Sequence, residues 1–373
     1  MPSICKRIAS HSCFIPVILL TFYIFFNYFE QTGIATMSSP DLHKIQRHNV
    51  GDMKDIISDL PDAILHYILS LLSTKDAIRT SILSSKWRYM WTQLSVFDFE
   101  VHKDGSNQKD QKSANCLFDI VGRLLHNSNC VERLCIKIRG ITVDAYKISP
   151  LIASAAKHKV KDLRLSLGDV SSKCVLPHSF SDFKSLTKLC LELKFTLYIP
   201  SRIRFPSVKT LLVIDVTFAN EKSVQRLFSG CPVLQELALC NCHFKNIKEI
   251  NVAISTLRIL IIHFDFVCLN YDQLDKCIVK IDAVNLLSLS CKSNPIIEFI
   301  PLNLTSIVDA CVDLTYKYAQ RVAHFAHHAA HRAIKLLSGL NSVKSLKISK
   351  ETLEVCMVVR SSSFFFSFQY RLG

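Results

Sequence analysis

The 373-residue chain has few of the residues that mark disordered or low-complexity proteins. It contains only 9 glycines and 11 prolines, and 49% of its residues are hydrophobic, which allows a substantial core in about two domains. Runs of five or more like charges are also missing, although 45 basic residues outnumber 31 acidic ones. Charge spread in this way favours a solvated basic surface over a nucleic-acid groove, and it suits an acidic protein partner.

Catalytic and metal-binding motifs are missing as well. The sequence has no P-loop, no G-x-G-x-x-G, no G-x-S-x-G and no H-E-x-x-H. Its 15 cysteines include no C-x-x-C pair, so their spacing encodes neither a zinc site nor a thioredoxin-like site. Scattered thiols of this kind act as small buried hydrophobes and suit a reducing compartment. We therefore expect a protein that is not an enzyme and holds no cofactor and no metal.

A histidine cluster is the one possible exception. His324, His327, His328 and His331 form two pairs at i, i+4, which could bracket a metal ion on a helix. The apolar residues of the same stretch fall on the opposite side, and no acidic residue joins the histidines. We expect a solvated helix face, with weak or incidental metal binding as the alternative.

Residues 55–100 carry three short amphipathic patterns. Ile64, Leu65, Ile68, Leu69 and Leu72 recur with helical period after Pro61, which is tolerated in a first helical turn. The run Ser73 to Asp76 has the S-x-x-D form of a helix cap, so a second short helix is expected. A third helical stripe is formed by Trp87, Met90 or Trp91, and Leu94. A segment of about 45 residues buries little of its apolar surface by itself, so we expect a partner or a neighbouring domain to cover these apolar side chains.

The same segment resembles the F-box of plant proteins that continue into leucine-rich repeats. The pattern L-P-D-x-I-L-x-x-I-L-S-x-L-x-T-K-D-A-x-R-T-S-x-L-S-x-x-W-R-x-x-W is matched over about 45 residues, with departures at Ser85 and Met90. The resemblance implies binding to the Skp-type adaptor of a cullin-RING ubiquitin ligase. The positions it implies as facing or supporting the adaptor are Leu60, Pro61, Ile64, Leu65, Ile68, Leu69, Ile78, Leu83 and Trp87.

A second pattern repeats through the rest of the chain. The phrase L-x-x-L-x-L, with Val or Ile in some positions, starts at Val131, Val160, Leu186, Val208, Leu234 and Leu257, and weaker copies start at Val284 and Val343. Its irregular step of about 22 to 29 residues overlaps the leucine-rich-repeat range. Each phrase alternates with period two, as in a strand with one buried face. The predicted fold is a three-helix F-box followed by an irregular leucine-rich-repeat α/β horseshoe, with a short convex helix at residues 223–228.

Residues between the core leucines are expected to point to the concave face of this horseshoe. The family resemblance makes that face the substrate surface. The candidate substrate-binding residues are Arg133, Lys137, Arg164, Lys188, Glu192, Glu236 and His263. Loops after the strands, such as residues 171–183 and 198–205, are equally plausible binding elements.

The domain boundaries follow from these patterns. We expect an apolar extension at residues 1–36, the F-box at 55–100, a polar linker at 101–127, the repeat domain at 128–350 and an atypical tail at 351–373. Lys6 and Arg7 precede an apolar stretch at 13–29, which is marginal for crossing a bilayer. Its alternatives are a membrane anchor that leaves the remainder in the cytosol, a secretory signal, or a translation start placed too early. The tail is expected to be truncated or aberrant, since it lacks a polar capping face.

The expected function is substrate recognition in a Skp-cullin-F-box ubiquitin ligase. The partners would be the Skp-type adaptor, through it the cullin-RING ligase, and an unknown protein substrate, in the nucleus or cytoplasm. A nucleic acid partner is not expected, and a membrane is expected only if residues 13–29 are a genuine anchor facing the cytosol. The competing interpretation is a membrane-associated or secreted leucine-rich-repeat recognition protein with no ligase role.

Overall fold

The computed structural model describes residues 60–103, 107–128, 130–168, 174–244, 247–264, 277–293, 297–314 and 323–357. The chain divides into two compact units between Leu94 and Ser95, which we name the helical unit and the repeat unit. The apolar extension expected at residues 1–36 and the end of the tail from residue 358 onward lie outside the described residues. Within the described ranges, none of the helices has the length and apolar content needed to cross a bilayer.

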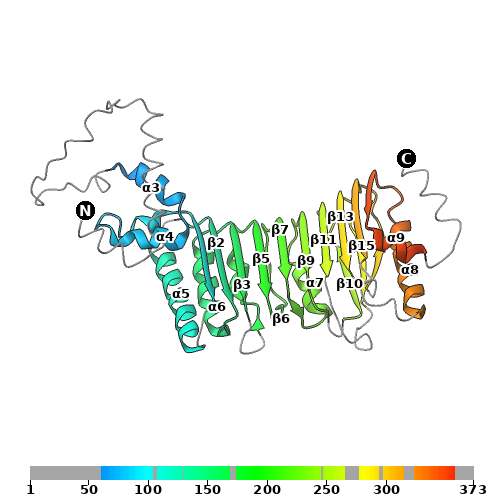
Figure 1. Ribbon diagram of the computed structural model, residues 1–373, viewed down its shortest axis with the longest axis horizontal. Helices are drawn as coiled ribbons and strands as arrows, with labels where there is room; N and C mark the ends of the chain where they lie inside the picture. Colours follow the sequence, from blue (N-terminus) through cyan, green and yellow to red (C-terminus); the bar gives the residue numbers. More distant parts are fainter. Residues whose placement is uncertain are drawn as a thin grey trace, which may run out of the picture. The chain divides into compact units, whose positions relative to one another are not determined.

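The described part of the helical unit opens with two short α-helices (Figure 1). Helix α3 (Asp62–Ser70) starts directly after Pro61, whose carbonyl accepts hydrogen bonds from the amides of Ile64 and Leu65. Helix α4 (Thr74–Arg79) is capped by Ser73, whose Oγ accepts from the amide of Asp76 at 3.2 Å. This contact confirms the predicted cap, which satisfies an amide that would otherwise have no partner in the first turn.

The third helix predicted in the helical unit is not an α-helix, although the apolar residues of its predicted stripe do lie in the core. After the 3-10 turn η2 (Thr80–Ile82), the chain passes through turns to a second 3-10 helix, η3 (Met90–Gln93). Tyr89 has φ −121° and ψ 0°, outside helical geometry, so an α-helix cannot run from Trp87 to Leu94. Trp87 and Met90 are nevertheless buried, and Trp91 and Leu94 lie against them.

These elements enclose a small core centred on Trp87, which is 1% exposed. The buried side chains are Leu65, Ile68, Leu69, Ala77, Trp87 and Met90. At the surface of the unit, Lys86 Nζ donates a hydrogen bond to the Leu60 carbonyl at 2.8 Å and forms an ion pair with Asp62 at 3.1 Å. The helical unit therefore buries part of its apolar surface without help from another chain.

The repeat unit is built on one ten-stranded parallel sheet, whose strands lie side by side in chain order in Figure 1. The strands are β1 (Val96–His102), β2 (Arg133–Arg139), β3 (Asp162–Leu167), β5 (Lys188–Leu193), β7 (Thr210–Ile214), β9 (Glu236–Cys240), β11 (Ile259–Phe264), β13 (Ser288–Ser293), β15 (Asp309–Leu314) and β16 (Ser345–Ile348). Each strand follows its neighbour with crossover segments on one side, as expected for a stack of repeats.

The repeated phrase explains the sheet. In the strands from β2 to β11 the L-x-L positions are buried, as in Leu189 and Leu191 of β5 or Leu237 and Leu239 of β9, whereas Leu346 and Ile348 of β16 are half-buried. The residue three positions before the first of these, such as Val208 before Leu211, is buried too and anchors the turn into the strand. The backbone register aligns these positions from strand to strand, so the six clear copies and the copy at Val343 are confirmed.

The copy predicted to start at Val284 has the wrong register. Leu289 of β13 pairs with Leu260 of β11, which makes Leu286 the buried anchor. Val284 and Leu287 are exposed instead. Two further strands went unpredicted because they carry few leucines: β1 buries Phe97 and Phe99, and β15 buries Ala310, Val312 and Leu314.

The segments that connect one main strand to the next, which we name the returns, lie on the other side of the core and differ from one another in secondary structure. Two short parallel sheets run there, one of β4 (Cys174–Val175), β6 (Thr196–Tyr198) and β8 (Thr217–Phe218), the other of β10 (Glu249–Ala253), β12 (Ile278–Asp282) and β14 (Glu298–Pro301). Helices α6 (Ala145–Lys157) and α8 (Ala323–Ser338) lie in further returns, while the 3-10 helix η4 (His178–Asp182) follows β4 and helix α7 (Glu221–Ser229) follows β8 in the same return. Helix α7 buries Val224, Leu227 and Phe228, which confirms the short helix predicted at 223–228.

Two predicted boundaries of the repeat unit are wrong. Residues 101–127, expected to be a linker, complete β1 and then form the 21-residue helix α5 (Asn107–Asn127), which packs against β1 and α6. Its apolar stripe of Leu117, Val121 and Leu124 has helical spacing, but the polar residues before it hid the pattern. At the other end, helix α9 (Lys350–Met357) belongs to the unit rather than to a tail, because Thr352 Oγ1 accepts from the Leu314 amide at 2.7 Å.

Adjacent leucines on β7 test this two-faced packing. We expect Leu211→Ala to destabilise the repeat unit by about 2–5 kcal/mol, since Leu211 is fully buried and its loss leaves a cavity. The matched variant Leu212→Ala removes a half-buried side chain on the opposite face and should cost clearly less. Urea unfolding curves of the two variants measure the difference. Equal losses would contradict the assignment of the two faces.

Candidate functional site

The strand residues that point away from the core form one continuous surface of the repeat unit, which we name the open face. The sheet register arranges it in three rows across the strands. The first row consists of Arg133, Asp162, Lys188, Thr210, Glu236 and Ile259. The second row consists of Cys135, Arg164, Cys190, Leu212, Ala238 and Ile261. The third row consists of Lys137, Ser166, Glu192, Ile214, Cys240 and His263.

All seven candidate substrate-binding residues lie on this face. The strand register puts Arg133, Lys188 and Glu236 in the first row, Arg164 in the second, and Lys137, Glu192 and His263 in the third. They are exposed or half-buried, so a partner could reach them. Their role in binding a substrate stays a prediction.

A buried carboxylate organises one end of the open face. Asp162 accepts hydrogen bonds from Arg133 Nε at 3.0 Å and from Arg164 Nε at 3.2 Å and Nη2 at 3.4 Å. The Asp162 side chain is 9% exposed, whereas each guanidinium group belongs to a side chain that is 48% exposed. One carboxylate therefore holds two cations in place at the surface.

Next to this group, β1 and β2 carry further ion pairs. Lys137 Nζ donates to Asp98 at 3.3 Å, and Glu100 pairs with His102 at 3.2 Å and with Arg139 at 3.8 Å. These pairs are exposed to solvent, so each contributes little to stability. They balance the charge over β1 and the outer part of β2.

The centre of the open face is apolar, which the candidate residues taken from the sequence did not reveal. Leu212 and Ile214 of β7, Ala238 of β9, and Ile259 and Ile261 of β11 are half-buried and adjacent in the strand register. Apolar residues at outward positions of a strand were the available indication, because alternation alone would place polar residues there. Half-buried aliphatic groups inside a polar surround are typical of a protein-binding surface.

The thiols on this face act as neutral packing groups. Burial raises the pKa of Cys190 to about 11, and burial together with the nearby Asp98 carboxylate raises the pKa of Cys135 to about 12. At neutral pH both side chains are therefore protonated and poorly nucleophilic. Cys190 supplies a short uncharged side chain between Arg164 and Leu212 in the second row.

In the helical unit, the nine residues implied by the resemblance divide into a buried and a more accessible set. Leu65, Ile68, Leu69 and Trp87 are buried in the unit's own core and can only support a binding surface. Leu60, Ile64 and Ile78 are half-buried. Only Pro61 and Leu83 are exposed to solvent.

Four further exposed apolar side chains are not among these nine residues. Among the described residues of the helical unit, the exposed large hydrophobic side chains are Tyr67, Leu71, Ile82, Leu83 and Tyr89. Tyr67 and Leu71 are one helical turn apart at the end of α3, and Ile82 is 69% exposed at the end of η2. A unit with its own core that still exposes five such groups indicates a docking surface.

The histidine cluster lies on helix α8. The side chains of His327, His328 and His331 are exposed, while Ala329, Ala333 and Leu336 on the other side are buried, as expected for a solvated helix face. Across the described ranges, no three His, Cys, Asp or Glu side chains are placed to hold a metal ion together.

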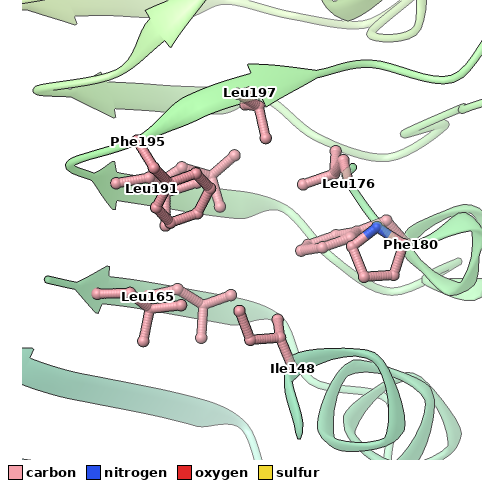
Figure 2. Close-up of a pocket in the computed structure, with 10 residues that line it drawn as sticks. Ile148, Leu165, Leu176, Phe180, Leu191, Phe195 and Leu197 are labelled. Atoms are coloured by element: carbon pink, nitrogen blue, oxygen red, sulfur yellow. The ribbon is translucent and has the colours of Figure 1, made fainter. Parts of the chain in front are cut away.

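The repeat unit also contains a small apolar pocket (Figure 2). Leu165 of β3 and Leu191 of β5 line it from the sheet, and Leu197 of β6 and Phe180 of η4 from the return side. All ten lining side chains are apolar, so the pocket offers no polar group that would orient a ligand. It is a packing gap in the core rather than a binding site.

Comparison with known proteins gives two matches to family profiles. The F-box domain matches residues 57–99, and the profile described as FBD-associated F-box protein At5g56370, LRR repeats, matches residues 148–299. These ranges cover all described residues of the helical unit and the central strands of the repeat unit.

Individual relatives from Arabidopsis thaliana agree with the profiles. The F-box/LRR-repeat protein At4g14103 is 31% identical over 269 residues, which cover 70% of this chain and 68% of that protein. The F-box/FBD/LRR-repeat protein At5g53840 and the F-box/LRR-repeat protein At1g55660 are each 31% identical, over 71% and 59% of this chain and 57% and 61% of their own lengths. The chain thus spans about half to two thirds of the curated relatives it matches.

The protonation of Cys190 can be tested by alkylation. Because its raised pKa keeps the thiolate scarce, iodoacetamide at pH 7.5 should modify the exposed Cys311 of the same row well before Cys190. Raising the pH toward 10 should speed the reaction of Cys190. Peptide mass spectrometry of timed samples follows both sites, and unfolding in guanidinium chloride should remove the difference. Equal rates in the folded protein would contradict the burial of the thiol.

Proposed function

The chain belongs to the plant F-box/leucine-rich-repeat protein family, and from that premise we propose that it is the substrate-recognition subunit of a Skp-cullin-F-box ubiquitin ligase. The helical unit binds the Skp-type adaptor, and the repeat unit holds a protein target. This role places the chain in the nucleus or cytoplasm, where the adaptor and the ligase work.

The observation that carries the proposal is the surface of the helical unit. Tyr67, Leu71, Ile82, Leu83 and Tyr89 remain exposed although the unit closes a core around Trp87. Burying such side chains against a partner contributes roughly 25 cal/mol for each Å² of apolar surface removed from water. In this proposal they contact the adaptor together with Pro61, while Leu65, Ile68, Leu69 and Trp87 hold the helices in position.

The repeat unit suits target binding for a complementary reason. Its core is complete along the sheet, so the open face is not needed for folding and is available to a partner. Neighbouring strands lie about 4.8 Å apart, whereas helices in the returns need about 10 Å. Returns that contain helices therefore favour the predicted horseshoe, in which the open face is concave.

The chain's contribution to ubiquitin transfer would be positioning. Bringing a target lysine close to ubiquitin carried by other subunits raises its effective concentration and lowers the entropic cost of the reaction. The thiols on the open face do not suit covalent transfer, since burial keeps Cys135 and Cys190 protonated.

Co-purification with a Skp-type adaptor tests the proposal. Ile82→Asp places a charge at the most exposed apolar side chain of the helical unit and should lower the affinity by about tenfold or more, because burying that charge is unfavourable. The core of the unit is not altered, so its circular dichroism spectrum should stay unchanged.

The matched control is Leu212→Asp, which lies on the open face of the repeat unit and should leave adaptor binding unchanged. Isothermal titration calorimetry with the purified adaptor gives both affinities. The proposal fails if the unaltered protein does not bind the adaptor at all.

A further inference from the structure

The two guanidinium groups at the end of the open face are prepared to bind an anion. Asp162 orients Arg133 and Arg164 through their Nε atoms. Among the described residues, no partner is placed on the two Nη atoms of Arg133 or on Nη1 of Arg164, and both side chains are about half exposed. A planar fork held in place by a carboxylate loses little entropy when it binds a second anionic group.

The charge around this site is positive. Lys188 follows Asp162 in the first row and has no ion-pair partner among the residues that the structure describes. The carboxylate of Asp162 is buried beneath Arg133 and Arg164, and Asp98, in the second row on β1, is paired with Lys137. An anionic side chain that docks here would complete the neutralisation of this part of the face.

The second row links this anion site to the apolar centre. From Arg164 the row passes over Cys190 to Leu212, Ala238 and Ile261 on successive strands. Cys190 and Ala238, the neighbours of Leu212 in this row, have short side chains. Two strand spacings, about 10 Å, separate Arg164 from Leu212.

In the polyproline II conformation an extended peptide advances about 3.1 Å per residue with three residues per turn, so side chains three positions apart point to the same side and lie about 9 Å apart. We propose that the open face binds an extended segment of a target protein in which an anionic side chain and a bulky aliphatic side chain are three positions apart. The anion lies over Arg133 and Arg164, and the aliphatic side chain lies against Leu212 and Ala238. This inference rests on the proposed function, since it names the chemistry of the target that the repeat unit recognises.

The surrounding charges favour one anion rather than a polyanion. Glu236 lies in the first row and Glu192 in the third, on either side of the second row. They would repel a nucleic acid or a run of acidic residues that extended past the arginines. A segment with a single anionic group next to apolar residues matches the second row, in which the arginine is followed by apolar side chains.

Selection from a phage-displayed library of random dodecapeptides tests the proposal with the full chain. The expected sequences carry Asp or Glu three positions from Leu, Ile, Met or Phe, in either chain direction. The triple variant Arg133→Gln, Asp162→Asn, Arg164→Gln removes the charges while keeping hydrogen-bonding side chains, and it should abolish the acidic preference but not the aliphatic one. Leu212→Asp should abolish the aliphatic preference.

Lys347→Gln is the matched control, since it removes an exposed cation in the same row on the distant strand β16 and should change neither preference. Thermal unfolding checks that every variant is folded. The proposal is overturned if the unaltered protein selects no such pair, or if the triple variant selects the same acidic residues.

Synthetic peptides then identify the anion. A selected peptide with Gln in place of its acidic residue should bind about tenfold more weakly in fluorescence anisotropy, and the triple variant should remove this difference. A phosphoserine version that binds more tightly than the Glu version assigns the site to a phosphoryl group, and a weaker one assigns it to a carboxylate. Equal binding of the Gln and Glu peptides would refute an anion site.

The outcome is separable from that of the proposed function. Adaptor binding depends on the helical unit, so a protein that binds the adaptor but selects no acidic and aliphatic pair refutes only this inference. A protein that selects the pair but does not bind the adaptor refutes the ligase role instead.

Discussion

The repeat unit depends on one buried layer of aliphatic side chains that is shared by neighbouring parallel strands. Each strand contributes two or three inward residues, and the backbone hydrogen bonds between strands keep those residues in line. A slip of one residue would turn every inward leucine to the solvent, so the layer and the register enforce one another. The anchor before each strand, such as Val208 or Leu234, closes the layer at the edge where the chain enters.

Because this layer supplies the core of the repeat unit, the outward side chains of the same strands are not required for packing and can differ in charge and polarity. The arginine pair around Asp162 and the aliphatic centre at Leu212 and Ile261 occupy outward positions that the core does not use. The helical unit is the contrasting case, because its described residues enclose Trp87 but leave Tyr67 and Ile82 exposed. In the repeat unit the exposed apolar groups belong to the second face of the sheet.

Most of the architecture could be predicted from residue patterns, and the failures have local causes. The leucine period located seven of the ten main strands, but in β13 two overlapping sets of apolar residues fit the phrase, and only pairing with β11 selects Leu286 and Leu289 over Val284 and Leu287. Helix α5 was hidden because its first residues are uniformly polar. The stripe of Trp87 and Met90 was found, yet its backbone is a 3-10 helix that periodicity cannot distinguish from an α-helix.

The sequence by itself determined the family resemblance, the two-unit division, the buried face of most strands, and hence the set of charged residues on the open face. These features are local, since alternation along a strand and caps at helix ends depend on residues close in the chain. Only the tertiary structure decided which of those residues meet. Arg133 meets Asp162, and Leu212 lies beside Ala238, through backbone register between segments more than twenty residues apart. Register is set by packing of the whole layer, so it cannot be obtained from any one segment alone.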